Sequence, residues 1–314
     1  MIRGDLPPLT VHLGLPKCAS SSLQRFFPDA AMAHFYMGKF KRNEQGLAYH
    51  TAEIETLFRR EIGLACEVNF NYTAARETLD QYFCEFNPEK RPVLLSEEVM
   101  SGFGFITHHK NHHLDPYIIL HRLKTLFPTL RIVLIIREQF KLLQSYYSEL
   151  LVQGYNIAYD QFVRKQLTEA KGLHNILKYG EYVSFLERQC DELVVIPFES
   201  LVKKDKFSVD AWEKLNISYN CILPHTRNTP SNAELHRLFC KNIQQTSRLG
   251  ALQSIYDLSR TQALIEDQKI LATPERLFWL EPQLQQDAML IFQSANKQLS
   301  QRLGLELASY GYFT

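Results

Sequence analysis

The stretch Leu9–Gln24 constrains the fold of this chain more than any other, because it joins a buried strand to a helix through a tight turn. Its sequence is LTVHLGLPKCASSSLQ. Alternating apolar residues predict a strand, Gly14 and Pro16 predict a turn, and three serines predict the start of a helix. A strand that runs directly into a helix N-terminus forms an anion site, because unpaired backbone N–H groups and the positive end of the helix dipole face the turn. Lys17 adds a full positive charge, so we expect the turn to bind phosphate or a similar group.

Composition limits the classes of protein to which the chain can belong. With 314 residues, of which 45% are hydrophobic and 22% charged, it is long enough to bury a substantial core. The net charge of +1 gives no general attraction to nucleic acid or to an anionic membrane, so anion recognition is expected to be local. The six cysteines form no CxxC pair, which argues against a zinc ribbon and indicates a reducing compartment. The sequence contains no apolar segment typical of a secretory signal or of a transmembrane helix, and it therefore predicts a cytoplasmic protein.

Short apolar runs and stretches with helical spacing alternate along most of the chain. The expected strands after the first are 92–95, 131–136 and 193–197, and the expected helices include 51–62, 74–86, 116–126, 139–152, 177–190 and 207–215. The mixed, basic segment 35–43 is expected to be a surface loop. The alternation predicts an α/β fold with a three-layer parallel sheet flanked by helices. Because the pattern is all helical later on, we expect one domain over 1–314, with a core at about 9–229 and a helical C-terminal region at about 230–314.

Polar side chains follow three of the expected strands. Lys17 follows the first strand, and Arg137 ends the most apolar one. Glu97 and Glu98 follow the strand between them, in the segment SEEVMSG. Ligands of parallel sheets bind outside the carboxyl ends of the strands, so we expect these side chains to share one edge. Arg137 offers a planar fork suited to phosphate, and Ser145, eight residues later on a helix, adds a directional donor to the same anion.

The loop differs from the ATPase pattern GxxxxGK[ST], because its lysine follows Gly14 by three residues with no glycine directly before it. The segment LPKCASSSLQ instead resembles the 5′-phosphosulfate loop of sulfotransferases that use 3′-phosphoadenosine 5′-phosphosulfate (PAPS), which reads approximately PK[TS]GTTxLQ. On this match Lys17 is the family lysine, Cys18 stands for threonine or serine, and Ala19 stands for glycine. The resemblance implies that PAPS is bound by six consecutive residues, Lys17, Cys18, Ala19, Ser20, Ser21 and Ser22.

The second signature of that family is a strand that ends in arginine, followed by a helix that carries serine. The pair binds the 3′-phosphate, and it matches Arg137 and Ser145 here. A basic residue of a later loop approaches the same phosphate, and the segment HTRNTPSNAEL places Arg227 at that position. Tyr179 is a weaker candidate, since an aromatic residue on a helix more often belongs to the core. The resemblance covers about residues 9–245 and implies a P-loop-like sheet.

Carbohydrate-directed and bacterial members of the family place a glutamate general base in a Ser-x-Glu pattern, after the strand that precedes the arginine strand. The pattern matches Ser96 and Glu98, with Glu97 as the second choice because a shift of one residue is easy. The segment His108–His113, HHKNHH, offers another base, since imidazole titrates near neutrality. Its spacing also suits zinc, but no carboxylate or cysteine stands beside it at ligand spacing, so we expect no metal.

Cys18 lies beside Lys17 at the start of a helix, where a thiol pKa is expected to fall. No motif supplies a histidine or asparagine partner for a cysteine nucleophile. We therefore expect Cys18 to be a small residue of the loop.

The resemblance implies a PAPS-dependent sulfotransferase that moves a sulfuryl group to a hydroxyl or amine by in-line transfer. Glu98 would remove the acceptor proton, and Lys17 would neutralise charge on the leaving oxygen. Carbohydrates, glycolipids and small metabolites are all open as acceptors. Two alternatives are a P-loop kinase that uses ATP or GTP and a non-catalytic nucleotide-binding protein of the same fold.

Overall fold

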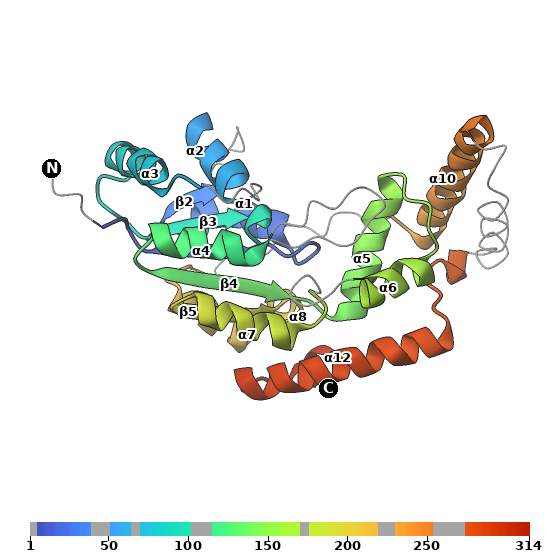
Figure 1. The fold of residues 1–314 in the computed structure, drawn as a ribbon. Helices are drawn as coiled ribbons and strands as arrows, with labels where there is room; N and C mark the ends of the chain where they lie inside the picture. Colours follow the sequence, from blue (N-terminus) through green and yellow to red (C-terminus); the bar gives the residue numbers. More distant parts are fainter. Residues whose placement is uncertain are drawn as a thin grey trace.

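The computed structural model describes residues 5–38, 51–63, 70–101, 115–169, 176–218, 230–253 and 274–314. Within these ranges, a parallel sheet of five strands forms the centre of the molecule (Figure 1). In spatial order its strands are β2 (Phe35–Gly38), β3 (Val93–Glu97), β1 (Leu9–Leu13), β4 (Leu130–Ile136) and β5 (Glu192–Pro197). This arrangement confirms the predicted α/β class.

The central strand of the sheet is β1, and each of its neighbours comes from a distant part of the chain. Val11 lies opposite Leu95 of β3 on one side and Ile132 of β4 on the other. All five residues of β1 are buried, as expected for a strand covered on both faces. The direction in which successive strands are added reverses beside β1, so the loop after β1 lies where parallel sheets bind ligands.

Helices cover both faces of the sheet (Figure 1). In the described ranges the α-helices are α1 (Ser20–Ala30), α2 (Ala52–Thr56), α3 (Tyr72–Phe86), α4 (Pro116–Leu126), α5 (Gln139–Val152), α6 (Tyr159–Thr168), α7 (Tyr179–Gln189), α8 (Phe198–Lys203), α9 (Lys206–Lys214), α10 (Asn232–Gln253) and α12 (Pro282–Leu303). They are joined by the π-helix η1 (Leu57–Ile62) and the 3₁₀ helices η2 (Glu98–Ser101), η4 (Pro274–Arg276) and η5 (Leu307–Tyr310). On one face α1 packs on α9 through Phe27 and Trp212, whose ring centroids are 5.6 Å apart. On the other, α4 packs on α7 through Tyr117 and Phe185, with centroids 4.3 Å apart. Together with the sheet, these two layers of helices make up the three layers that the sequence predicts.

One element was predicted wrongly. The segment expected to be a loop begins with the strand β2, which pairs with β3 in parallel, and residues 39–43 lie outside the described residues. Phe35 and Met37 of this strand are buried. Four residues at the edge of a sheet give too short a pattern to recognise, and pairing with β3 decides their conformation.

The C-terminal region is helical, as predicted. The helix α12 packs on α6 and α7, and α10 packs on α5 (Figure 1). Among the helices that the structure describes, none combines the length and the apolarity needed to cross a bilayer.

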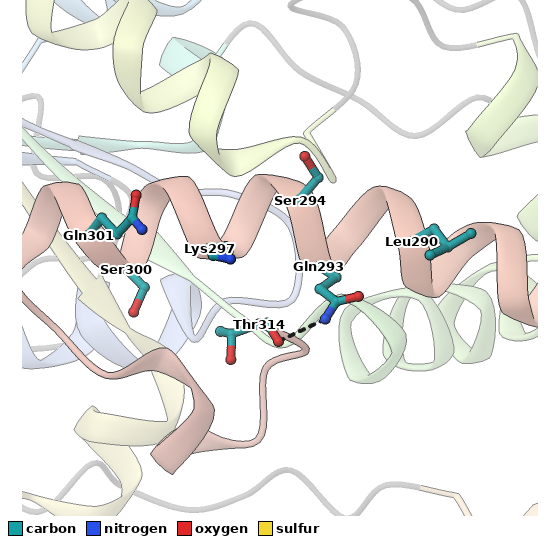
Figure 2. Close-up of a pocket in the computed structure, with 7 residues that line it drawn as sticks. All are labelled: Leu290, Gln293, Ser294, Lys297, Ser300, Gln301 and Thr314. Atoms are coloured by element: carbon teal, nitrogen blue, oxygen red, sulfur yellow. Dashed lines mark hydrogen bonds between the residues drawn. The ribbon is translucent and has the colours of Figure 1, made fainter.

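A shallow hollow lies beside α12, next to the last residues of the chain (Figure 2). Its lining residues are Leu290, Gln293, Ser294, Lys297, Ser300, Gln301 and Thr314. None of them belongs to the loop after β1 or to the ends of β3 and β4, so this hollow is separate from the site that the sequence predicts.

Candidate functional site

The loop between β1 and α1 turns through two residues in the left-handed region of backbone space. Lys17 has a φ of 63° and Ala19 a φ of 64°. A left-handed residue other than glycine costs about 1–2 kcal/mol, and such residues cluster at ligand sites. Ala19 stands where the resembling family has glycine, and it keeps the left-handed conformation at this cost. It also precedes α1 without a side-chain cap, and its carbonyl accepts from the N–H groups of Ser22 (2.9 Å) and Leu23 (3.0 Å), so the N–H groups of α1 before Ser22 are left for another acceptor.

Close packing at Gly14 brings Glu98 onto the start of the loop. A Cβ atom added at Gly14 would lie 2.8 Å from Cγ of Glu98 and 2.8 Å from Oγ of Ser20. Any larger residue at this position would therefore displace Glu98 or Ser20. The Ser20 hydroxyl donates to the Leu15 carbonyl (3.2 Å) and closes the loop, whereas Ser21 and Ser22 are half-buried.

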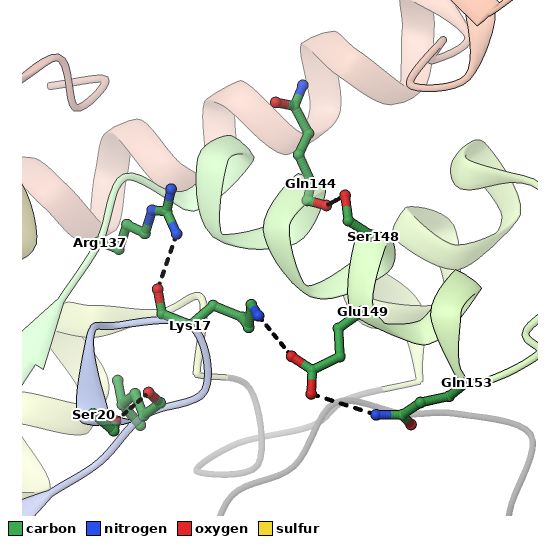
Figure 3. Close-up of polar contacts among 8 residues, drawn as sticks. Lys17, Ser20, Arg137, Gln144, Ser148, Glu149 and Gln153 are labelled. Atoms are coloured by element: carbon green, nitrogen blue, oxygen red, sulfur yellow. Dashed lines mark hydrogen bonds and ion pairs between the residues drawn. The ribbon is translucent and has the colours of Figure 1, made fainter. Parts of the chain in front are cut away.

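Arg137, at the end of β4, reaches the loop. Its Nη1 donates to the carbonyl oxygen of Lys17 (2.9 Å; Figure 3). Its guanidinium carbon lies 4.7 Å from the ring centroid of Phe198. Its Nε is buried and has no hydrogen-bond partner in the described part of the chain. A buried donor of this kind suits an anionic ligand, because burying it without an acceptor is unfavourable.

Tyr179 holds the backbone of Arg137 in place. Its hydroxyl donates to the Arg137 carbonyl (2.6 Å) and accepts from the Arg137 N–H (3.2 Å). The ring is fully buried, and burial raises the pKa of the phenol well above its usual value. Tyr179 is thus a core residue that positions Arg137.

Cys18 is buried, and the expected fall of its thiol pKa is wrong. Burial raises the pKa of the thiol far above its usual value, and the nearby charge of Arg137 only partly opposes this effect. The thiol is therefore protonated and a poor nucleophile.

The turn that follows Arg137 is braced by the C-terminal region. Glu138 accepts two backbone N–H groups of the first turn of α5 and caps that helix, and burial raises the pKa of its carboxyl. The buried amides of Gln139 and Asn296 bond each other reciprocally, at 2.7 and 3.1 Å. Glu199 accepts from the Tyr312 hydroxyl (2.9 Å) through one oxygen and from the Glu138 N–H (3.2 Å) through the other. No local pattern predicts the contacts of Glu199 with Glu138 and Tyr312 or the pair of Gln139 and Asn296, because they join residues 61, 113 and 157 positions apart.

Of three further candidates, Ser145, Arg227 and the segment His108–His113, the structure describes only Ser145. Ser145 lies half-buried in the second turn of α5, the helix that begins two residues after Arg137. Arg227 and the segment His108–His113 lie outside the described residues.

The two adjacent carboxylates occupy different surroundings. Glu97, the last residue of β3, is 4% exposed and forms an ion pair with Arg59 (3.3 Å), which also pairs with Glu55 (2.8 Å). Glu98, the next residue, is half-buried and packs against Gly14 as described above. Of the two carboxylates, Glu98 is therefore the one that packs against the start of the loop after β1.

Beneath the loop, β1 carries a buried imidazole. His12 Nδ1 lies 2.8 Å from the Ser96 hydroxyl of β3, and the ring of Phe27 packs edge-on at 5.3 Å between centroids. Burial lowers the pKa of His12 from 6.5 to about 3. The histidine is therefore neutral in the folded protein and ties β1 to β3.

This imidazole predicts a loss of stability in mild acid. As the pH falls through about 6.5, His12 binds a proton in the unfolded chain. In the folded protein it stays neutral until about pH 3, so the free energy of unfolding falls. Between about pH 8 and pH 5 the loss from His12 is about 2 kcal/mol, since one pH unit corresponds to about 1.4 kcal/mol. Urea unfolding at several pH values measures the slope. His12→Asn, which does not titrate, should show a shallower slope than wild type, and equal slopes would contradict the prediction.

Glu149, which contacts the loop directly, was also not predicted from the sequence. Glu149 of α5 binds the Lys17 ammonium, with 2.6 Å between Oε2 and Nζ (Figure 3). It lies four residues after Ser145, so it shares a helix face with a candidate residue, and this spacing was the available signal.

Comparisons with known proteins assign no family to the chain. No protein-family model matches the sequence. No curated protein matches it either. Among solved structures, the chain is similar to the crystal structure of a sulfotransferase from Alicyclobacillus acidocaldarius, with 16% identity and a TM-score of 0.43, over 78% of this chain and 95% of that one.

Proposed function

We propose that the protein is a sulfotransferase that takes its sulfuryl group from PAPS and transfers it to a hydroxyl or amine, with a carbohydrate as the first acceptor class to test. The observation that carries the proposal is the hydrogen bond between Arg137 Nη1 and the Lys17 carbonyl (2.9 Å). It places side by side the two segments that resemble the phosphate-binding segments of PAPS-dependent enzymes. A nucleotide with separate 5′ and 3′ phosphate groups suits two such neighbouring segments.

The chain's own residues have distinct parts in this proposal. The uncapped N–H groups at the start of α1 and the hydroxyls of Ser21 and Ser22 would hold the 5′-phosphate. Arg137 and Ser145 would hold the 3′-phosphate, together with Arg227. We also propose that residues 1–314 form one domain, because the C-terminal region braces the turn beside Arg137.

In the reaction, PAPS supplies the sulfuryl group. Glu98 would accept the proton of the attacking hydroxyl or amine, whose oxygen or nitrogen bonds to sulfur as the bond from sulfur to the 5′-phosphate oxygen breaks. Lys17 would stabilise the negative charge that develops on that oxygen, and 3′-phosphoadenosine 5′-phosphate is released. Positioning and electrostatics suffice for this step, without a covalent bond to the protein.

We expect 3′-phosphoadenosine 5′-phosphate to stabilise the protein against heat in the absence of Mg²⁺. A ligand at about 100 times its Kd adds about 2.7 kcal/mol to the free energy of unfolding, which corresponds to several degrees in Tm. Adenosine 5′-phosphate, which lacks the 3′-phosphate, should give a smaller shift. Differential scanning fluorimetry measures both.

Two variants and one competing ligand sharpen this test. Ser145→Ala should reduce the shift with 3′-phosphoadenosine 5′-phosphate and leave the shift with adenosine 5′-phosphate unchanged, because only the first ligand carries the 3′-phosphate. Ser184→Ala, on α7, is the matched control and should change neither shift. A larger shift with ATP and Mg²⁺ than with 3′-phosphoadenosine 5′-phosphate would overturn the proposal and favour a kinase.

A further inference from the structure

The ammonium group of Lys17 is held by a carboxylate of the protein itself. Glu149 Oε2 lies 2.6 Å from Lys17 Nζ, and Gln153, directly after the end of α5, donates to the other carboxylate oxygen at 3.4 Å (Figure 3). Lys17 and Glu149 are 132 residues apart in sequence, so the pair joins the loop to α5 across the site.

Lys17 is thus fixed at both of its ends. Its backbone is left-handed and its carbonyl accepts from Arg137, whereas its side chain extends to Glu149. The side chain of Lys17 is 28% exposed and that of Glu149 is 42% exposed. Partly exposed ion pairs are weak, so an anion that enters the loop can take the ammonium group from the carboxylate.

We propose that Glu149 tunes the affinity of the loop for its nucleotide, because it competes with the anionic end of the nucleotide for Lys17. In the unloaded protein it neutralises the ammonium group, on binding it is displaced, and on release it takes the ammonium group back. Its negative charge also repels a phosphate bound to the loop. Glu149 therefore lowers the affinity for donor and product alike and favours product release. This inference rests on the proposed function for the identity of the nucleotide, but not for the competition itself.

The test compares the affinities of the full-length wild type and Glu149→Gln for 3′-phosphoadenosine 5′-phosphate by calorimetry. We expect the variant to bind about 2- to 10-fold more tightly, since it loses both the competing ion pair and the repulsion. The gain should shrink as salt is raised, because both effects are electrostatic and partly exposed to solvent.

A matched control separates a local effect from the change in net charge. Glu281 pairs with Arg164 at the same 2.6 Å and is similarly exposed, but it lies between α6 and α12, and Glu281→Gln should leave the affinity unchanged. A double variant tests the mechanism. In a Lys17→Met background, Glu149→Gln should give a smaller gain than in wild type, because no ammonium group is left to compete for.

Inorganic pyrophosphate serves as a second probe that makes the two proposals distinguishable. If pyrophosphate binds Glu149→Gln more tightly than wild type while 3′-phosphoadenosine 5′-phosphate binds neither, the competition stands and the proposed function fails. If 3′-phosphoadenosine 5′-phosphate binds wild type and Glu149→Gln equally, or the variant more weakly, the inference about Glu149 fails and the proposed function stands. Binding of neither probe to any variant overturns both.

Discussion

Replacement of Glu98 by glutamine is expected to lower turnover about 10²–10⁴-fold, which is the usual contribution of a general base. The amide keeps the shape of the side chain and its packing against Gly14, but it cannot accept the proton of the acceptor. Binding of 3′-phosphoadenosine 5′-phosphate should therefore be retained. The measurement is the initial rate with labelled PAPS and an acceptor found by screening.

The neighbouring Glu97→Gln is the comparison that locates the base. Because Glu97 is buried in an ion pair with Arg59, we expect this substitution to lower stability more than turnover. The opposite result, in which Glu97→Gln has low turnover and Glu98→Gln has near-normal turnover, would assign the role of base to Glu97. Near-normal turnover in both would assign it to the segment His108–His113.

Replacement of Lys17 by methionine is expected to lower kcat about 10²–10³-fold, as does removal of one group that stabilises developing charge in other enzymes. Methionine keeps much of the length and the apolar stem of the side chain and removes the charge. The affinity for 3′-phosphoadenosine 5′-phosphate should fall less, about 10-fold, because the charge on the leaving oxygen develops only in the transition state. Initial rates and calorimetric Kd values, measured on the same preparation, give the change in kcat and the change in affinity.

A second lysine provides the control for this prediction. Lys165 of α6 pairs with Glu169 at 3.8 Å, and its replacement by methionine removes the same charge from a helix that is not part of the loop. Lys165→Met should leave kcat within about 2-fold of wild type, since surface pairs contribute little. If Lys17→Met lowers kcat no further than Lys165→Met does, Lys17 has no part in the transition state.

The parts of the fold that were predicted correctly are those with long, regular patterns. The helix α5 was expected at 139–152 and is found at Gln139–Val152, and β4 was expected at 131–136 and is found at Leu130–Ile136. The strand β2 and the helix α6 were not recognised. A four-residue edge strand carries little pattern of its own, and its conformation depends on pairing with β3.

The residues of the candidate site likewise fall into those that could be predicted from the sequence and those that could not. Lys17 and Arg137 could be placed at one edge from sequence, because parallel strands bring their carboxyl ends together. Glu149 and Tyr312 could not, because a pairing between distant side chains leaves no local pattern. Cys18 shows how burial overrides a local expectation: its place at a helix start predicts a low thiol pKa, and its removal from water raises that pKa instead.

The central position of β1 has a consequence for how the protein is made. Lys17 and Arg137 are separated by 120 residues, and a ribosome that adds roughly 5–20 residues per second needs roughly 6–24 s to pass from one to the other. During this time the apolar strand β1 has already been synthesised, but β4, one of the two strands between which it is buried, has not. The strand β1 is thus synthesised well before it is enclosed on both sides, and the nascent protein is expected to depend on chaperones or on low expression temperature to avoid aggregation.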